Sequence, residues 1–529
     1  MLRSVIQRLN SSLGGGAVLI AFFSVISKIV GFWRDRLLAS MFGASRVTDI
    51  YFASFKIPDL VFNIFILGAV TSAFIPVFQK AWQRDRNAAL RLASSVLNML
   101  LLLMTVTAVL LFILAPQLVH ALVPGFDQES LDWTIRLTRI LLLSLIFFTI
   151  SNVLSGVLNA WNKFFTFAIS SVVYNIGIII GIVFFYPAFG LDGLGLGVVL
   201  GAALHMGVQL VEAIRQGWFY SPILELSQDS RRIFSLMIPR TIGLAGNQVA
   251  LVIVTILASL LPSGNIAIFN YANNLQSFPI SVFGISLAVA AFPSFSLAAA
   301  RQDMREFKKL FSQQTIRILY FLMPISVFVI LLRAHIVRVV LGTGVFDWDA
   351  TILTANALGL FALSLPAQGI IPLLSRSYYA LEDTRTPVLI TLLGMGCTIF
   401  LSILFLPSVG VLGLALAHSI GSLLTLSALY LILRNKLAGL DSRRLFSAFS
   451  RILILTTLAA SIVYLSLVLT APLLNLRTFI GIFMHAAIAT ILGTCTYIML
   501  GSLLHIEEVA IVRRMVRKFF QPITDVLRH

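Results

Sequence analysis

Charged residues are scarce in this sequence. Asp, Glu, Lys and Arg together account for 11% of its 529 residues, and hydrophobic residues for 59%, whereas a soluble globular protein is about 25% charged. No polar stretch between the hydrophobic runs is long enough to form a soluble domain. Cysteine is scarcer still. Cys397 and Cys495 both lie inside hydrophobic segments, which excludes a disulfide framework and predicts two small buried residues. These absences indicate an all-α polytopic membrane protein.

The sequence also lacks the motifs of ATP-driven and metal-dependent enzymes. It contains no nucleotide-binding P-loop, no zinc-ligand spacing and no strained nucleophile turn. We therefore predict no catalytic residue, no metal and no cofactor, and we expect a monomer. The net charge of +17 does not indicate nucleic-acid binding, because the basic residues occupy short loops between hydrophobic segments, as the positive-inside rule expects.

Hydrophobic segments of membrane-spanning length recur along the whole chain. A span needs about 20 apolar residues, and we count about 14 candidates. They are 17–43, 52–79, 92–122, 133–160, 165–186, 191–213, 232–261, 265–298, 313–341, 351–380, 387–407, 410–433, 447–470 and 477–504. The connecting loops alternate between a basic set and a neutral or acidic set, which predicts both termini in the cytoplasm. The basic tail 505–529 is predicted to lie on the anionic inner leaflet.

Short matches within the sequence indicate a parallel internal repeat. The Leu-Gly-Leu run at 194–196 recurs at 412–414, and Asn159-Ala160 matches Tyr379-Ala380. The nearly constant offset between these matches spans six segments, so the two halves share one orientation, as in transporters with a central site. We predict an N-lobe 1–213, a C-lobe 214–446, a pair of extra helices in 447–504 and a cytoplasmic tail 505–529.

Charged and polar side chains interrupt the first two spans. By helical spacing Lys28 and Asp35 fall on one face of the first helix, which also carries Arg34, and Lys56, Asp59 and Asn63 fall on one face of the second. A charge at the centre of a membrane helix costs roughly 2.5–3.5 kcal/mol, so such residues usually face a water-filled cavity or a partner. Arg36 and Lys56 could instead lie near the ends of these helices, with side chains that reach the headgroup layer.

Two segments of the predicted C-lobe carry matching polar faces. Asn270, Asn273, Asn274, Ser277 and Ser281 follow helical spacing, and Arg240 and Asn247 lie seven apart on the preceding segment. We predict that these faces and those of the first half line one solvated cavity, cationic on the N-lobe side, that accepts a phosphate-bearing amphiphile. The alternative is that the Asn and Ser side chains join helices, at about 0.6 kcal/mol each.

Several short motifs resemble those of one family. They are Gly31-Phe32-Trp33-Arg34-Asp35, Phe42-Gly43-Ala44 with Thr48-Asp49, Phe55-Lys56-Ile57-Pro58, Pro124-Gly125-Phe126, Phe278-Pro279, and the run from Tyr378 to Pro387 that contains Asp383 and Thr384. In these motifs the sequence resembles the bacterial lipid II flippases of the MurJ (MviN) family, part of the multidrug/oligosaccharidyl-lipid/polysaccharide (MOP) exporter superfamily.

The resemblance implies a function in cell wall biosynthesis and cell shape. The substrate would be the undecaprenyl-pyrophosphate-linked peptidoglycan precursor, a lipid-linked oligosaccharide, moved from the inner to the outer leaflet of the bacterial inner membrane as two six-helix lobes rock. The last two helices would form a groove for the lipid tail. Arg34 matches a family arginine thought to contact the headgroup, Lys28 replaces a usual arginine, and Asp35, Asp49 and Lys56 match family positions.

The sequence also departs from the family pattern. Phe62-Asn63 and Leu67 stand where the family usually has an arginine pair and a glutamate, and Asn273-Asn274 replaces an Asp-Arg pair. Two alternatives therefore stay open: another transporter of the superfamily, such as a polysaccharide-lipid flippase or a drug/cation antiporter, and a membrane scaffold that transports nothing.

Overall fold

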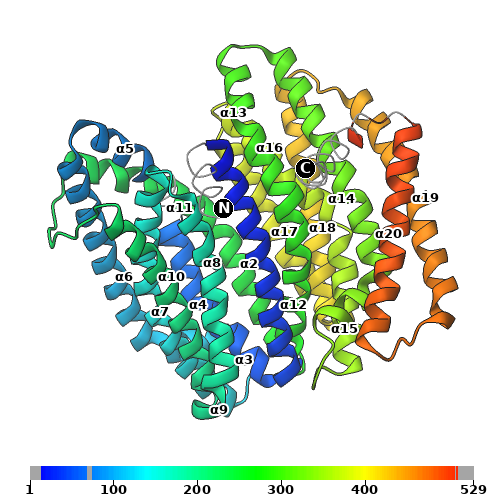
Figure 1. Cartoon of the computed structure of the whole chain (residues 1–529), viewed down its shortest axis with the longest axis horizontal. Helices are drawn as coiled ribbons and strands as arrows, with labels where there is room; N and C mark the ends of the chain where they lie inside the picture. Colours follow the sequence, from blue (N-terminus) through cyan, green and yellow to red (C-terminus); the bar gives the residue numbers. More distant parts are fainter. Residues whose placement is uncertain (1–12, 68–73, 505, 507, 510–529) are drawn as a thin grey trace, which may run out of the picture. The chain divides into compact units, whose positions relative to one another are not determined.

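The structure is a computed structural model that describes residues 13–67, 74–504, 506 and 508–509. These residues form helices joined by short loops, with no strand among them (Figure 1). The predicted cytoplasmic tail 505–529 lies almost entirely outside the described residues. Inside the helices the side chains at 13–18, 20–21, 66–67, 236 and 238–247 also lie outside the described part.

The helices of the first half are, in chain order, α2 Leu13–Phe42, α3 Arg46–Ser54, α4 Lys56–Phe62, the π-helix η1 Asn63–Leu67, α5 Ile75–Arg84, α6 Arg86–Leu122, α7 Gln128–Ala160, α8 Phe164–Ile180, the π-helix η3 Gly181–Phe185, α9 Tyr186–Phe189, α10 Leu191–Arg215 and α11 Gln228–Ser259.

Those of the second half are α12 Asn265–Pro279, the π-helix η4 Ile280–Ile285, α13 Ser286–Ala300, α14 Met304–Val340, α15 Trp348–Ala362, α16 Leu365–Ala380, α17 Arg385–Val409, α18 Val411–Lys436, α19 Ser442–Thr470, the 3-10 turn η5 Ala471–Leu473 and α20 Phe479–Leu503.

Within the described residues, the predicted spans coincide with helices or with runs of consecutive helices. In the described residues ten helices are long and apolar enough to cross a membrane, and α15 with α16, bent by 45°, makes an eleventh. The other three predicted spans, 17–43, 52–79 and 232–261, each include residues whose side chains are not described. The chain is thus an all-α polytopic membrane protein, and the count of 14 stays a prediction.

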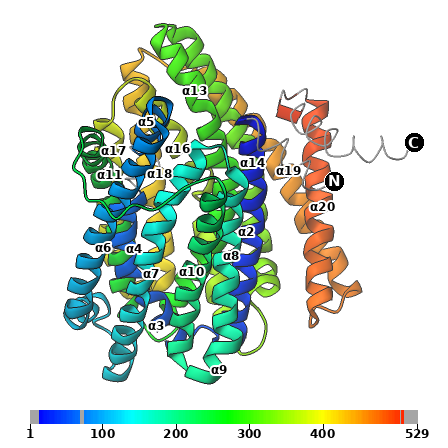
Figure 2. The same ribbon diagram turned by 60° about the vertical axis from the view of Figure 1, so that its left-hand side comes forward.

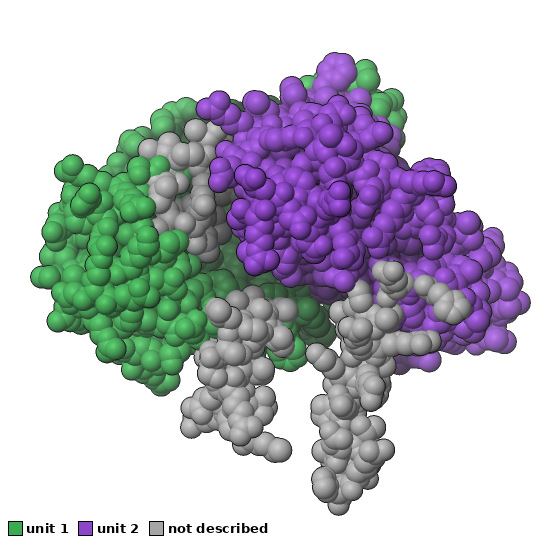
Figure 3. Space-filling model, turned by 90° about the horizontal axis from the view of Figure 1, so that it is seen from above, with its two compact units in different colours: residues 1–271, 340–350, 402–414 green, residues 272–339, 351–401, 415–529 purple. Residues whose placement is uncertain are grey.

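The chain divides into two compact units, coloured in Figure 3. Unit 1 comprises 1–271, 340–350 and 402–414, and unit 2 comprises 272–339, 351–401 and 415–529. Two segments of the second half, 340–350 and 402–414, therefore pack within unit 1. The predicted division into lobes at 213 and 446 follows the repeat rather than these contacts, and it stays a prediction.

Glycine allows the closest helix packing in unit 1. A Cβ at Gly177 would lie 2.3 Å from the Cα of Gly201, and one at Gly181 would lie 2.4 Å from the Cα of Gly197. The backbones of α8–η3 and α10 consequently touch along a stripe of small residues, the packing that membrane helices use where no hydrophobic effect drives them together. This contact fixes α8, which carries part of the candidate site.

Two carbonyls freed by prolines accept side-chain hydrogen bonds. Pro324 cannot donate to the carbonyl of Tyr320, and the Tyr497 hydroxyl of α20 donates to that oxygen at 2.9 Å in unit 2. Pro116 likewise frees the carbonyl of Phe112, which accepts from Arg139. Such groups must be satisfied inside protein because the bilayer core offers no water. In unit 2, α20 also runs beside α19 (Figure 2).

The turn geometry repeats along the chain at one constant spacing. Gly190 and Gly410 both have positive φ, 59° and 60°. A Cβ on either Gly193 or Gly413 would clash with backbone atoms of the phenylalanine eight residues earlier. The register therefore pairs Gly413 with Gly193, not with the Gly195 that the Leu-Gly-Leu match selects. Positive φ at Asn162 and Glu382 repeats with the same spacing.

The expectation that both cysteines are buried is wrong. Cys397 and Cys495 are free and exposed. A thiol in a membrane span behaves as a small apolar group, so lipid contact costs it little.

Candidate functional site

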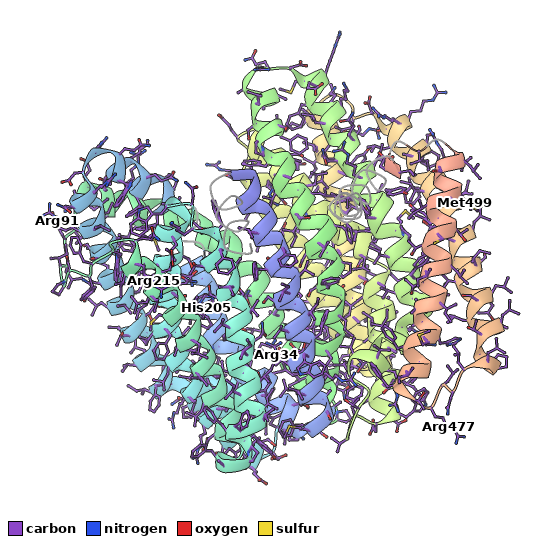
Figure 4. The ribbon with its side chains drawn as sticks, viewed as in Figure 1. Arg34, Arg91, His205, Arg215, Arg477 and Met499 are labelled. Carbon is purple, nitrogen blue, oxygen red and sulfur yellow. The ribbon has the colours of Figure 1, made fainter. Side chains whose placement is uncertain are left out.

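Arg34, in the second half of α2 (Figure 4), is held by two partners in unit 1. Its Nε and Nη2 donate to Oδ1 of Asp35 at 3.0 and 2.7 Å, and its Nη1 donates to Oδ1 of Asn175 on α8 at 3.1 Å. The Arg34 side chain keeps 20% of its exposure and Asp35 only 5%. These bonds use three of the five guanidinium N–H groups, so two remain for an anionic ligand.

Asn175 is itself fixed in orientation. Its Nδ2 donates to Oγ of Ser27 at 3.3 Å and to the carbonyl of Ser171 at 3.0 Å. Gly31 faces this amide, because a Cβ there would lie 3.7 Å from Oδ1 of Asn175, an ordinary van der Waals distance. Ser27, Gly31 and Arg34 therefore lie on the face of α2 that meets Asn175. The motif glycine and arginine thus belong to one α2–α8 contact.

Lys56 of α4 reaches a residue from the second half of the chain. Its Nζ donates to Oδ1 of Asn270 on α12 at 3.0 Å, and both residues belong to unit 1. Asn270 in turn donates from Nδ2 to the carbonyl of Ile266 at 2.7 Å, which orients its amide. Lys56 is half-buried and hydrogen-bonded rather than directed to a helix end, which disfavours the alternative that it reaches for the headgroups.

Three tyrosines surround these groups. Tyr51 of α3 and Tyr174 of α8 interact electrostatically with both Arg34 and Asp59. Tyr271 of α12 interacts with Arg34, and its buried hydroxyl has no hydrogen-bond partner among the described residues. Segments α2, α3, α4, α8 and α12 therefore bring their polar side chains together.

We call this group the polar cluster. Its members are Lys28, Arg34, Asp35, Tyr51, Lys56, Asp59, Tyr174, Asn175, Asn270 and Tyr271. It holds three cations and two carboxylates, so its net charge is positive by one. Lys28 and Asp59 are exposed, whereas Asp35 is buried. Asn63 lies in η1, one turn after Asp59, and bonds to the carbonyl of that residue at 2.8 Å.

Asp49 has a structural role at the start of α12. Its Oδ2 accepts from the backbone N–H of Gly264 at 2.6 Å and its Oδ1 from that of Ala267 at 2.9 Å. Gly264 has a φ of +94°, and a Cβ there would lie 2.3 Å from the carbonyl oxygen of Ala44. A buried carboxylate from α3 thus caps a helix that begins far along the chain. The cap holds the start of the helix that carries Asn270 and Tyr271.

The motif residues near 383 also form a cap, in unit 2. Asp383 accepts from the N–H and the hydroxyl of Thr386 at 3.0 and 2.8 Å, and from Nζ of Lys436 at 2.6 Å. Partial burial acts to raise the pKa of Asp383, but these hydrogen bonds outweigh it and lower the pKa to about 2. Thr384 is exposed and Pro387 is buried in the first turn of α17. This motif joins two helix ends rather than lining the polar cluster.

The other predicted residues of α12 belong to unit 2. Asn273 accepts a hydrogen bond from Gln276 at 3.0 Å, and Gln276 accepts one from Gln368 at 3.0 Å. Gln368 also donates to the hydroxyl of Ser364 at 2.8 Å, and that hydroxyl bonds to the hydroxyl of Ser419 at 2.9 Å. These bonds link α12, α16 and α18. The hydroxyls of Ser277 and Ser281 bond back to their own helix. Asn273 therefore belongs to a hydrogen-bond network that joins helices, and the two serines bond within their own helix.

Two predicted positions add less. Asn274 is half-buried on α12. Arg240 lies on α11, but its side chain, like that of Asn247, lies outside the described residues. Convergence of all these positions on one cavity stays a prediction.

Sequence reasoning missed four members of the polar cluster: Tyr51, Tyr174, Asn175 and Tyr271. Asn175 interrupts an otherwise apolar run, and that signal was readable. The tyrosines gave no such signal, because an aromatic residue in a membrane helix is usually a packing residue.

Comparisons with known proteins agree on one family. The family model described as "Lipid II flippase MurJ" matches residues 38–484. The probable lipid II flippase MurJ of Buchnera aphidicola subsp. Schizaphis graminum is 30% identical over 427 residues, covering 79% of this chain and 82% of that protein. The lipid II flippase MurJ of Burkholderia cenocepacia is 27% identical over 428 residues, covering 79% and 83%.

Solved structures share the fold. One described as lipid II flippase MurJ in an inward closed conformation gives a TM-score of 0.78 at 24% identity, covering 92% of this chain and 99% of that one. An inward-facing MATE transporter of the MOP superfamily gives 0.69 at 14% identity, covering 80% and 98%. Since the family model covers most of the sequence and the Buchnera relative matches over most of its own length, the chain belongs to the MurJ family of lipid II flippases.

Proposed function

We propose that this chain moves lipid II, the lipid-linked peptidoglycan precursor, from the inner to the outer leaflet of the bacterial inner membrane. It is a multi-pass membrane transporter of the MurJ family, not an enzyme. The family membership and the polar cluster support the proposal together. The cluster supplies what a pyrophosphate headgroup needs: a guanidinium with two donors left over, two ammonium groups, and hydroxyls beside them.

We further propose how the parts act. Arg34 and Lys28 of α2 and Lys56 of α4 contact the headgroup, while Asp35 and Asp59 hold these cations in place. Both termini face the cytoplasm, and the repeated halves rock in alternating access. The two last helices, α19 and α20, receive the lipid tail. The family model begins at residue 38, so the roles of Lys28 and Arg34 rest on the geometry around Asn175 and Asp35.

Complementation tests the headgroup role of Arg34. Cells depleted of their own flippase should grow with the unmutated chain and with Arg34→Lys at reduced efficiency, and should lyse with Arg34→Glu. Reversal of an exposed loop charge, Arg301→Glu, is the control for charge alone. Full rescue by Arg34→Glu at equal membrane levels would remove Arg34 from the headgroup site.

A second candidate is another substrate within the MOP superfamily. The observation that favours it is the small net charge of the polar cluster, with Asn63, Asn273 and Asn274 at positions where the family usually has charged residues. Failure of the unmutated chain to complement, with its membrane insertion verified, would favour this reading over lipid II.

A further inference from the structure

The linker between α10 and α11, residues 216–227, contains no helix and lies against α6 in unit 1. Ser95 of α6 donates to the carbonyl of Glu225 and accepts from its N–H, both at 2.9 Å. Asn98 donates to the carbonyls of Ser221 and Ile223 at 3.1 and 2.8 Å. Tyr220 donates from its hydroxyl to Asn98 at 2.9 Å. The Ser221 N–H also donates to Ser94 at 3.2 Å, so three polar side chains of one helix hold the linker.

These anchor residues lie on the outward face of α6. Asn98 shares its helical face with Leu102, Val106, Val109 and Ile113, at spacings of four, eight, eleven and fifteen residues. Those four side chains are exposed, between 49% and 61%. Exposed apolar residues in a membrane span face lipid. The linker consequently lies over the inner end of a lipid-facing stripe.

The depth of the contact follows from the sequence of α6. Residues 92–119 carry no charge, and this run is about 42 Å long as a helix, longer than the hydrocarbon core of about 30 Å, so its first turns extend into the headgroup layer. Ser94, Ser95 and Asn98 are the polar residues at the start of this run, which places them in the headgroup layer. Arg91, one turn before Ser95, is exposed at the same end of the unit as Arg215 (Figure 4).

The outer side of the linker is apolar. Phe219, Tyr220, Leu224 and Leu226 are 46%, 52%, 64% and 61% exposed, whereas Trp218 is buried and anchors the linker in the core of unit 1. Exposed leucine and phenylalanine in a loop are unfavourable in water but typical of segments at the headgroup level, where aromatic residues concentrate. Two exposed cations beside the linker, Arg91 and Arg215, outnumber its one exposed carboxylate, Glu225.

We propose that residues 218–227, here called the strap, dock on anionic phospholipid headgroups, with Phe219, Tyr220, Leu224 and Leu226 inserted among them. Arg91 and Arg215 pair with the lipid phosphates. The strap joins α10 to α11, so lipid binding holds the chain between the two halves of the sequence at a fixed depth. Lipid composition then influences how freely α11 moves against α6.

Depth-resolved quenching tests the strap in the intact chain. Cys397→Ala and Cys495→Ala provide a background without thiols, and Leu224→Cys carries a bimane label in nanodiscs of phosphatidylcholine with phosphatidylglycerol. Leu224 is exposed, so the substitution leaves packing intact, and Leu226→Cys is the second probe. Gln302→Cys, at an exposed turn between α13 and α14 on the same predicted side, is the matched control.

The proposal predicts several-fold stronger quenching at Leu224→Cys by lipids with a nitroxide near the headgroup than by lipids labelled at the chain end, and weak quenching at Gln302→Cys. Replacing phosphatidylglycerol by phosphatidylcholine should reduce the headgroup quenching. Quenching at both strap probes equal to that of the control would overturn the membrane contact. Strong quenching that is independent of lipid charge would overturn the assignment to anionic headgroups.

Discussion

Removal of the Asp49 carboxylate should loosen the start of α12. Asp49→Ala deletes the acceptors of two buried N–H groups, at Gly264 and Ala267. A buried donor left unsatisfied costs about 1–3 kcal/mol, so the pair costs about 2–4 kcal/mol if water reaches one of them in part. Asp49→Asn keeps one acceptor and loses the charge that the helix N-terminus favours, so its cost should be about half as large.

Amide hydrogen exchange measures this locally. If the first turn of α12 opens on its own, a loss of about 2–4 kcal/mol speeds exchange of the Gly264 and Ala267 amides about 30- to 1000-fold. The peptide covering 262–270 reports it by mass spectrometry. Asp383→Ala, which removes the cap of α17 instead, is the matched control and should speed exchange at 384–388 alone.

The reasoning has a clear point of failure. Exchange at 262–270 that is unchanged in Asp49→Ala would refute the cap, because no other acceptor for those two amides exists among the described contacts. A faster exchange spread evenly over the whole chain would instead indicate global destabilisation. In the local case, exchange at 262–270 in Asp49→Asn should be faster than in the unmutated chain and slower than in Asp49→Ala.

Two further predictions concern side-chain hydrogen bonds in unit 2. The folded-state pKa of Asp383 lies below its ordinary value, so its bond to Lys436 stabilises the protein above about pH 4 and is lost as the pH falls toward about 2. The difference in thermal midpoint between the unmutated chain and Asp383→Asn should therefore hold from neutral pH to about pH 4 and then close. A constant difference at pH 3 would contradict the assignment. Tyr497→Phe removes the donor to the Tyr320 carbonyl that Pro324 leaves free. The loss should cost about 0.6–1.7 kcal/mol of stability and lower the thermal midpoint. The control Tyr464→Phe, on an exposed side chain of α19, should leave the thermal midpoint unchanged.

Hydropathy alone located the spans, because the cost of burying a backbone in lipid is the same for every residue and leaves a signal of about 20 residues. The charges of α2 and α4 were equally readable, since a cation in an apolar run is costly without a partner. The sequence could not supply those partners. Asn175 and Asn270 come from helices far along the chain, and helix–helix packing alone decides which amide meets which cation.

Asp49 illustrates the same limit. Its motif was recognisable, but the helix that it caps belongs to the second half of the sequence, and no local pattern encodes that contact. The Leu-Gly-Leu match of the repeat was displaced in register, because Gly193 and Gly195 both match Gly413 in sequence. The close approach of the backbone to Phe185 and Phe405 and the positive φ of Gly190 and Gly410 distinguish them. Ser95 and Asn98 gave no hint of the linker that they hold.

Flipping of fluorescent lipid II by the purified chain in liposomes tests the central claim most directly. A reductant added outside measures how much labelled headgroup has crossed from the inner leaflet. The account predicts transfer by the unmutated chain, little by Arg34→Glu or Lys56→Glu, and transfer near the unmutated level by Arg301→Glu. Equal transfer by all four proteins would contradict a headgroup site at the polar cluster, and no transfer by any would contradict lipid II as the substrate.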